Sequence, residues 1–196
     1  MSDLVGKKLV SGVLRWLVLG LFVLTPGLMA AEVPSLVSGL DLVSGKNFFH
    51  RLSEANRSTV LVFLSTRCPC SASHQPALNQ IAEEFGPKGI QLIGVHSNAN
   101  ESLDEAKQFF SQSKFSFPVI QDSGSVLADQ LGAFKTPHVF VLNPKSEIVF
   151  QGGVDNSKLF EKATRHFLRD ALGEVVQGRA PKEQNVRVIG CQIQRP

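Results

Sequence analysis

The sequence contains no tyrosine, one tryptophan and only three cysteines, and neither its basic nor its acidic residues form a long run. A basic surface interleaved with aromatic residues is typical of nucleic-acid-binding proteins. Because nothing of this kind is present, we expect no nucleic-acid partner. The formal net charge of +3 comes mostly from residues 1–31, since the rest of the chain holds 17 Lys and Arg against 16 Asp and Glu. With 43% hydrophobic residues, the composition indicates a nearly neutral domain with a sizeable core.

Three cysteines are too few, and odd in number, for a small secreted scaffold held together by disulfides. Scaffolds of that kind carry four or more cysteines in pairs. Redox or metal chemistry is therefore favoured over a structural role for the three cysteines, which are Cys68, Cys70 and Cys191.

No apolar run near the start of the chain is long enough for a comfortable membrane span. The run Trp16–Leu24 is short, and Pro26 follows it closely. Three basic residues precede this run: Lys7, Lys8 and Arg15. The pattern predicts a signal peptide over residues 1–31, cleaved near Ala30 or Ala31. We expect the mature protein in the periplasm or an equivalent oxidising compartment, with membrane contact only if the leader stays uncleaved.

A strand, a turn and a helix are predicted around the first two cysteines. An apolar, β-branched run from Thr59 stops at Cys68-Pro-Cys70, and a helical apolar pattern begins directly afterwards. This places the thiols at a helix N-terminus, where unpaired N–H groups and the macrodipole stabilise a thiolate. Arg67 adds a positive charge next to them. The sequence therefore predicts an exposed, activated sulfur at Cys68, with a pKa below that of a free thiol.

The remaining elements alternate between strands and helices. Predicted strands cover Ile90–Val95, Phe117–Ile120, His138–Leu142 and Glu147–Gln151. Predicted helices start at the capping box Ser102–Glu105, carry Val126 to Leu131, and run from Ser157 to Leu172 with Gly173 as the cap. A short helix is possible over Asn47–Leu52. This order predicts an α/β fold with a central mixed sheet and helices on both faces.

Several of these motifs occur in the order typical of thioredoxin-fold proteins. They are Phe63 to Ser71 around the Cys68 turn, Pro76 in the helix, the Thr136-Pro137 step, and Gly190-Cys191-Gln192-Ile193 near the end. From about Thr59 to Ile193 the sequence resembles the thioredoxin-fold redoxins, most of all the peroxiredoxin-like alkyl hydroperoxide reductase and thiol-specific antioxidant group. The resemblance divides the chain into a lead-in (32–58), a thioredoxin-like domain (59–172) and a tail (173–196).

The resemblance also implies roles for individual residues. Cys68 would be the nucleophile, and Pro137 would be cis and face it. Thr136 would then pair with an incoming peptide or flank the sulfur. This sequence departs from its relatives in that Ser71 replaces the second thioredoxin cysteine and Cys70 is an additional thiol. Leu61 and Ser65 stand where true peroxiredoxins carry proline and threonine.

Two functions stay open from the sequence. In the first, the protein is a periplasmic thiol-disulfide oxidoreductase or peroxiredoxin-like reductase that needs no cofactor. Cys68 attacks a protein disulfide or a peroxide, and Cys70 or Cys191 resolves the intermediate. In the second, the protein is a copper chaperone that binds Cu(I) through Cys68, Cys70 and His74, soft and borderline donors close in sequence. Copper chaperones of the same fold use two cysteines and a histidine.

The tail has two interpretations. Extended, it is long enough to reach any face of a domain of this size, so Cys191 can act as a partner of the active turn. Alternatively, Val188, Ile189 and Ile193 attach the tail to an apolar surface, with Cys191 buried among them.

Overall fold

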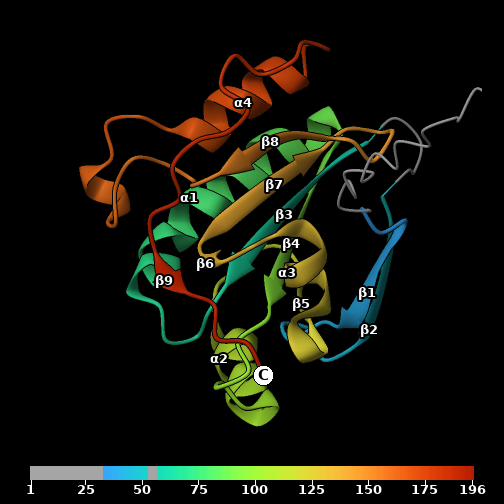
Figure 1. The fold of residues 1–196 in the computed structure, drawn as a ribbon, viewed down its shortest axis with the longest axis vertical. Coiled ribbons are helices and arrows are strands. Elements are labelled where there is room, and N and C mark those ends of the chain that lie inside the picture. Colours follow the sequence, from blue (N-terminus) through green and yellow to red (C-terminus); the bar gives the residue numbers. More distant parts are fainter. Residues whose placement is uncertain (1–32, 53–56) are drawn as a thin grey trace, which may run out of the picture. The chain divides into compact units, whose positions relative to one another are not determined.

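The computed structural model describes residues 33–52 and 57–196, and its centre is a five-stranded sheet (Figure 1). The strand order is β5-β4-β3-β7-β8, in which β3, β4 and β5 are parallel and β7 is antiparallel to both its neighbours. The strands are β3 (Ser58–Leu64), β4 (Ile90–His96), β5 (Val119–Gln121), β7 (His138–Leu142) and β8 (Ile148–Gly152). The predicted fold class is confirmed. The predicted signal peptide lies outside the described residues.

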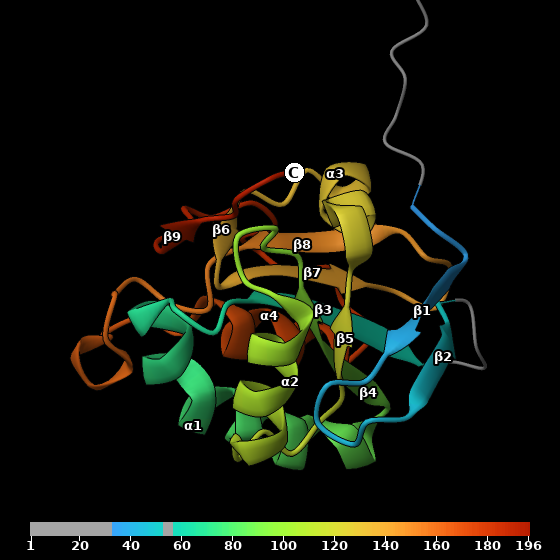
Figure 2. The same ribbon diagram turned by 90° about the horizontal axis from the view of Figure 1, so that it is seen from below.

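The strand β3 is at the centre because it is apolar or β-branched from Thr59 onward and all seven of its residues are buried. Its alternate side chains belong to two separate cores. Val60, Val62 and Leu64 pack with α1 (Pro69–Phe85), α2 (Leu103–Gln112) and α4 (Phe167–Val175). Leu61 and Phe63 pack with α3 (Val126–Leu131) and with apolar residues of the lead-in. Figure 2 shows α3 on the opposite side of the sheet from α1 and α2.

The lead-in forms a hairpin of β1 (Leu36–Leu40) and β2 (Asn47–Arg51), so the short helix considered over Asn47–Leu52 is wrong. A helix of this length satisfies almost none of its own backbone groups, whereas pairing with β1 gives the same residues an antiparallel ladder. Asp41 then joins the hairpin to the sheet edge, since its carboxylate accepts a hydrogen bond from Val119 N at 3.1 Å.

The last helix is also shorter and later than predicted. In place of a helix over Ser157–Leu172, the chain makes a single 3-10 turn at Phe160–Lys162 and then α4, which continues past Gly173 to Val175. The reason is Asn156, whose side-chain oxygen accepts hydrogen bonds from Thr164 N and Arg165 N at 3.0 and 3.2 Å. These bonds close residues 156–165 into a loop and prevent a continuous helix.

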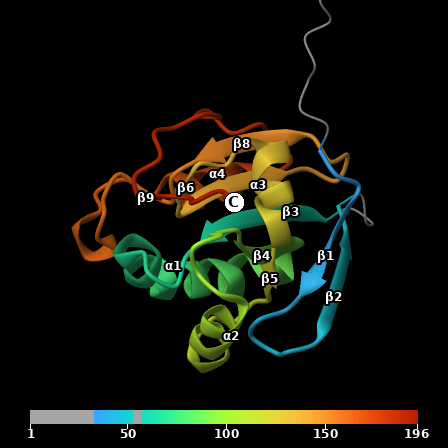
Figure 3. The same ribbon diagram turned by 60° about the horizontal axis from the view of Figure 1, so that its bottom comes forward.

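The tail runs back along the domain and ends beside the sheet. The two-residue strand β9 (Cys191–Gln192) pairs antiparallel with β6 (Lys135–Thr136), and the register places Cys191 opposite Thr136. Figures 1, 2 and 3 agree that β9 lies next to β6. Within the described part of the chain, no helix has the length and apolar character needed to cross a membrane.

Candidate active site

The Cys68 turn is formed where β3 ends and α1 begins. Cys68 is the N-cap residue of α1 and Pro69 follows at the first helical position, where a missing N–H costs nothing. No side chain caps this helix end. The backbone N–H of Ser71 therefore remains available to the sulfur of Cys68, and it is one of the groups that lower the pKa of this thiol. The predicted position of the thiol at a helix N-terminus is confirmed.

The sulfur of Cys68 is not exposed, and that part of the prediction is wrong. The residue retains 2% of its accessible surface, because the tail strand β9 lies over it. Its Sγ donates to the carbonyl oxygen of Thr136 at 3.0 Å. The Thr136–Pro137 bond is cis, as predicted from the resemblance. Thr136 thus flanks the sulfur and also pairs with Cys191 of the chain's own tail.

The three thiols differ in acidity. Burial opposes ionisation of Cys68, but the Cys191 thiol, Thr136 and nearby backbone N–H groups outweigh it and lower the Cys68 pKa to about 7. The hydroxyl of Thr136 is buried and has no hydrogen-bond partner among the residues that the structure describes, so its proton can turn to the sulfur when Cys68 ionises. Burial and the neighbouring Cys68 raise the pKa of Cys191 to about 12. Burial and Cys68 also raise the pKa of Cys70.

Arg67 does not contribute to the acidity of Cys68 as predicted. Its guanidinium donates two hydrogen bonds to Glu105, at 2.7 Å from Nε and 2.6 Å from Nη2. The sequence predicted a capping box of Ser102 and Glu105. One of its two hydrogen bonds is present, since Ser102 Oγ accepts from Glu105 N at 3.2 Å. The Glu105 carboxylate, however, neutralises Arg67. The groups that lower the Cys68 pKa most are neutral donors around the sulfur.

His74 lies in the first turns of α1 and has both ring nitrogens engaged. Nδ1 is 2.7 Å from the carbonyl oxygen of Cys70, and Nε2 is 2.9 Å from a carboxylate oxygen of Asp155. Both partners accept, so the geometry fits an imidazolium that donates twice. Burial acts to lower the His74 pKa, but the bonds to Asp155 and Cys70 raise it overall.

This arrangement bears on the copper hypothesis. An imidazolium has no lone pair for a metal ion, so His74 is not placed as a ligand beside Cys68 and Cys70. Within residues 33–52 and 57–196, no group of three His, Cys, Asp or Glu is placed to hold a metal.

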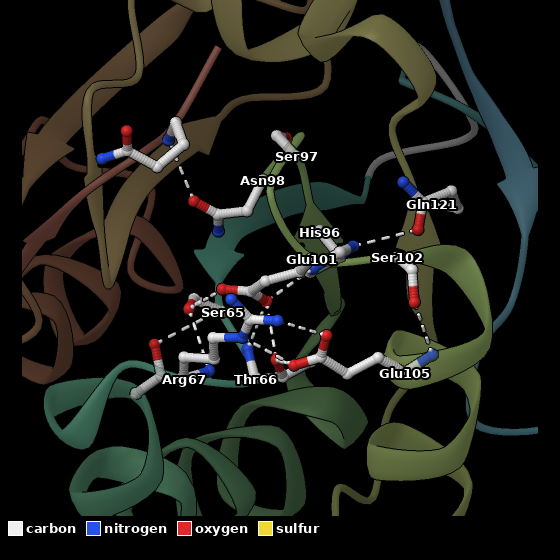
Figure 4. A network of polar contacts seen from close by, with 12 residues as sticks. Ser65, Thr66, Arg67, His96, Ser97, Asn98, Glu101, Ser102, Glu105 and Gln121 are labelled. Carbon is white, nitrogen blue, oxygen red and sulfur yellow. Dashed lines mark hydrogen bonds and ion pairs between the residues drawn. The ribbon is translucent and has the colours of Figure 1, made fainter. Parts of the chain in front are cut away.

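Sequence reasoning missed a buried polar network around Glu101, which Figure 4 shows together with Ser65 and Thr66. The carboxylate of Glu101 accepts from Ser65 Oγ at 2.5 Å and from the backbone N and the hydroxyl of Thr66 at 2.8 Å each. It also accepts from His96 Nε2 at 2.9 Å. Burial works to raise the Glu101 pKa, yet these bonds lower it to about 2. Glu101 therefore fixes the backbone just before Cys68. A signal for this network is present in the sequence. The segment with Ser65 and Thr66 and the segment with Glu101 follow the carboxyl ends of two parallel strands, β3 and β4, which meet at the same edge of the sheet.

A small hollow of about 210 Å³ lies between the turn, the loop at Asn98–Glu101 and the tail, and Cys68 and Cys191 belong to its lining. Asn98 belongs to its lining, and its buried side-chain nitrogen has no hydrogen-bond partner in the described part of the chain. The site therefore combines a buried acidic thiol, a second thiol on the tail, and unused hydrogen-bond donors.

Residues 41–151 match the family model described as AhpC/TSA family. The chain belongs to the AhpC/TSA family. This agrees with the resemblance drawn from the Cys68 turn and the Thr136-Pro137 step.

Individual relatives are more distant. The thiol-disulfide oxidoreductase ResA of Halalkalibacterium halodurans is 29% identical over 93 residues, which cover 47% of this chain and 52% of that protein. The sporulation thiol-disulfide oxidoreductase A of Bacillus subtilis is 24% identical, with 67% and 82% covered. The chain thus spans about half the length of the ResA relative.

Among solved structures, an uncharacterized conserved protein from Geobacillus kaustophilus has a TM-score of 0.73 at 23% identity, covering 84% of this chain and 90% of its own. StoA from Bacillus subtilis has a TM-score of 0.51 at 21% identity, with 61% and 87% covered. At these identities the structures establish the fold.

Proposed function

We propose that this protein is an exported thiol-disulfide oxidoreductase in which Cys68 is the nucleophile and Cys191 resolves the intermediate. The observation that carries the proposal is the β6–β9 pairing, which sets Cys191 opposite Thr136 while Thr136 O contacts Cys68 Sγ. The names of the ResA and sporulation relatives support the reaction class. Export is proposed from the leader pattern of residues 1–31.

The pKa values of the two thiols suit these roles. At neutral pH a large fraction of Cys68 is thiolate, since its pKa is about 7. The thiolate attacks one sulfur of a disulfide RSSR, forming a Cys68–SR mixed disulfide and releasing RS⁻. Cys191 then gives its proton to a leaving thiolate and attacks Cys68 Sγ, which expels the second RS⁻. The net reaction oxidises Cys68 and Cys191 to a disulfide and reduces RSSR to two thiols.

The raised pKa of Cys191 is compatible with the second step. Burial is its first cause, and the neighbouring Cys68 is the second. When Cys68 is part of a mixed disulfide it carries no charge, so this second contribution disappears. Cys191 therefore becomes easier to deprotonate at the stage where it must attack.

Cys70 is the less suitable resolving thiol. Cys68 and Cys70 are two positions apart, and a bond between their sulfurs would close a strained ring. Burial and the proximity of Cys68 both raise the pKa of Cys70.

The experiment that tests the proposal is disulfide mapping combined with turnover of variants. Wild-type protein treated with a stoichiometric disulfide should give a Cys68–Cys191 peptide without reduction. Cys191→Ser should accumulate a mixed disulfide on Cys68, whereas Cys70→Ser should still form the tail disulfide. A Cys191→Ser variant that turns over like the parent, with Cys68–Cys70 as the bond formed, would contradict the proposal. Hydrogen peroxide in place of the disulfide tests the peroxidase alternative, in which Cys68 is oxidised to a sulfenic acid before Cys191 attacks.

A further inference from the structure

The tail strand occupies the one edge of β6 that lies beside Cys68. Lys135 pairs with Gln192 and Thr136 pairs with Cys191, so the backbone of this segment is already engaged by the chain itself. An extended peptide that adds as a strand to a sheet edge needs the same free backbone groups. A protein substrate of that kind and the tail therefore exclude each other at this position.

The close approach of the tail depends on Gly190. A Cβ at this position would lie 2.7 Å from the carbonyl carbon of Thr136 and closer still to its oxygen. Backbone atoms cannot move aside as a flexible side chain can, so any larger residue must push the tail away from β6. By contrast, a Cβ at Gly173 in α4 would meet nothing within 4 Å.

Beyond β9 the tail is firmly attached. Ile193 retains 3% of its accessible surface within the core around Phe63, and its N–H donates to Phe134 O at 3.0 Å. The backbone of Gln194 makes two hydrogen bonds with the neighbouring loop. Its N–H donates to Asn98 Oδ1 at 3.0 Å, and its carbonyl oxygen accepts from Ala99 N at 2.9 Å. The strand is thus a fixed wall of the site rather than a loose tether.

With this wall in place, two hollows remain next to the thiols. One, of about 210 Å³, includes Cys68 in its lining. The other, of about 440 Å³, is bounded by Pro69, Cys70, Lys158, Leu159, Gly190 and Cys191. Ligand pockets in general have volumes of roughly 300–1,000 Å³. The hollow beside Cys70 falls in this range, whereas the hollow beside Cys68 is smaller and admits a compact molecule. Neither Lys135 nor Thr136, the two residues of β6, lines either hollow.

We infer that the tail strand makes Cys68 selective for small disulfides and thiols over extended protein segments, and that Gly190 determines this selectivity. The inference rests on the proposed function. The Cys68 thiolate attacks a small disulfide RSSR in the 210 Å³ hollow, the first RS⁻ leaves, and Cys191 displaces the second. The products are the Cys68–Cys191 disulfide and two small thiols, because the two cysteines are oxidised and the small disulfide is reduced.

The test compares two substrates and three forms of the full-length, reduced protein. The small substrate is 2-hydroxyethyl disulfide, and the large one is an extended peptide whose cysteine carries the same 2-mercaptoethanol group as a mixed disulfide. The forms are wild type, Gly190→Ala and the matched control Gly173→Ala. Rapid quenching and mass spectrometry measure the first step, which is mixed-disulfide formation on Cys68, so the measurement does not depend on resolution by Cys191.

Wild type and Gly173→Ala should react at least roughly tenfold faster with the small disulfide than with the peptide. Gly190→Ala should reduce this preference by roughly fivefold or more, because the displaced tail frees the β6 edge. Equal rates for both substrates in wild type, or an unchanged ratio in Gly190→Ala, would overturn the inference.

A second variant covers the case in which Gly190→Ala folds poorly by circular dichroism. Ile193→Ala weakens the attachment of the tail and should change the ratio in the same direction, and an unchanged ratio in it would also overturn the inference. Failure of the proposed function is distinguished by Cys68→Ser. If that variant still reduces 2-hydroxyethyl disulfide, the assignment of Cys68 as the nucleophile is wrong, whatever the ratio of the two substrate rates is in the other variants.

Discussion

Two buried histidine–carboxylate pairs adjoin the Cys68 turn, and they differ in what else the carboxylate holds. His96 and Glu101 are 2.9 Å apart, and Glu101 also accepts from Ser65 and Thr66. His74 and Asp155 are likewise 2.9 Å apart, but the second Asp155 oxygen accepts from the backbone of its own loop, from Ser157 N at 2.8 Å. The first pair therefore fixes backbone that precedes the nucleophile, whereas the second places a positive charge within the helix that follows it.

The Glu101 pair acts on the geometry of the Cys68 turn, and the His74 pair acts on its charge. Glu101 is held in its ionised form by several donors, so its loss should disturb structure first. The Cys68 thiolate helps to raise the His74 pKa, and because such an interaction is mutual, protonated His74 favours the thiolate. Loss of His74 should therefore change the acidity of Cys68 more than the fold. The following predictions test this division.

The largest effect is expected for Glu101→Gln. Removing the charge leaves His96, Ser65 and Thr66 with a poorer acceptor in a buried site, so the free energy of unfolding should fall by about 3–5 kcal/mol. Urea denaturation of the reduced protein measures this. Glu105→Gln, which changes a partly exposed carboxylate, is the matched control and should cost less than about 1 kcal/mol. Equal losses in the two variants would contradict a structural role for Glu101.

The same carboxylate predicts a pH dependence. The Glu101 pKa is lowered in the folded protein from 4.5 to about 2. Its contribution to stability is therefore fully present above about pH 4.5 and is lost as the pH falls toward 2. Urea denaturation at a series of pH values should show wild type approaching Glu101→Gln in acid. Parallel curves for the two proteins over this range would rule the contribution out.

A smaller effect, confined to reactivity, is expected for His74→Gln. Without the imidazolium the Cys68 pKa should rise, and alkylation by iodoacetamide at pH 7 should slow by about 3–5-fold as the thiolate fraction falls. At pH 9 the rate should return to the wild-type value, since Cys68 is then ionised in both proteins. A rate that stays low at pH 9 would show that His74 acts through structure and not through charge.

Asp155→Asn should have a related but weaker effect. The loss of Asp155 removes one of the groups that raise the His74 pKa, so His74 should lose its proton at lower pH. In wild type, the His74 contribution to stability is present below its ordinary pKa of 6.5 and is lost as the pH rises through the higher folded value. This loss on the alkaline side should be smaller in Asp155→Asn. Thermal unfolding at pH 6 and pH 9 measures the difference.

The smallest effect is expected for Arg67→Gln, although Arg67 is the nearest cation to Cys68 in the sequence. Its guanidinium is exposed and paired with Glu105, so alkylation of Cys68 at pH 7 should change by less than about twofold. A decrease as large as that of His74→Gln would show that the sequence-based expectation for Arg67 was right after all.

Local sequence patterns predicted most of the sheet. The apolar run of β3, the Cys68 turn and the start of α1 are contiguous, and each satisfies its own periodicity, so neighbouring residues were sufficient to define them. The predictions failed where a distant or polar side chain intervened. Asn156 closes a loop in place of a helix, and β1 turns the segment after Gly45 into a strand.

The sequence by itself determined that Cys68 stands at a helix N-terminus, because that depends only on residues within a few positions of it. The tertiary structure decided its surroundings. Burial of Cys68 under β9, the pairing of Cys191 with Thr136, the turning of Arg67 to Glu105 and the bonds of Glu101 to Ser65 all join residues more than thirty positions apart. Such contacts depend on how the strands and helices pack, and no spacing along the chain encodes them.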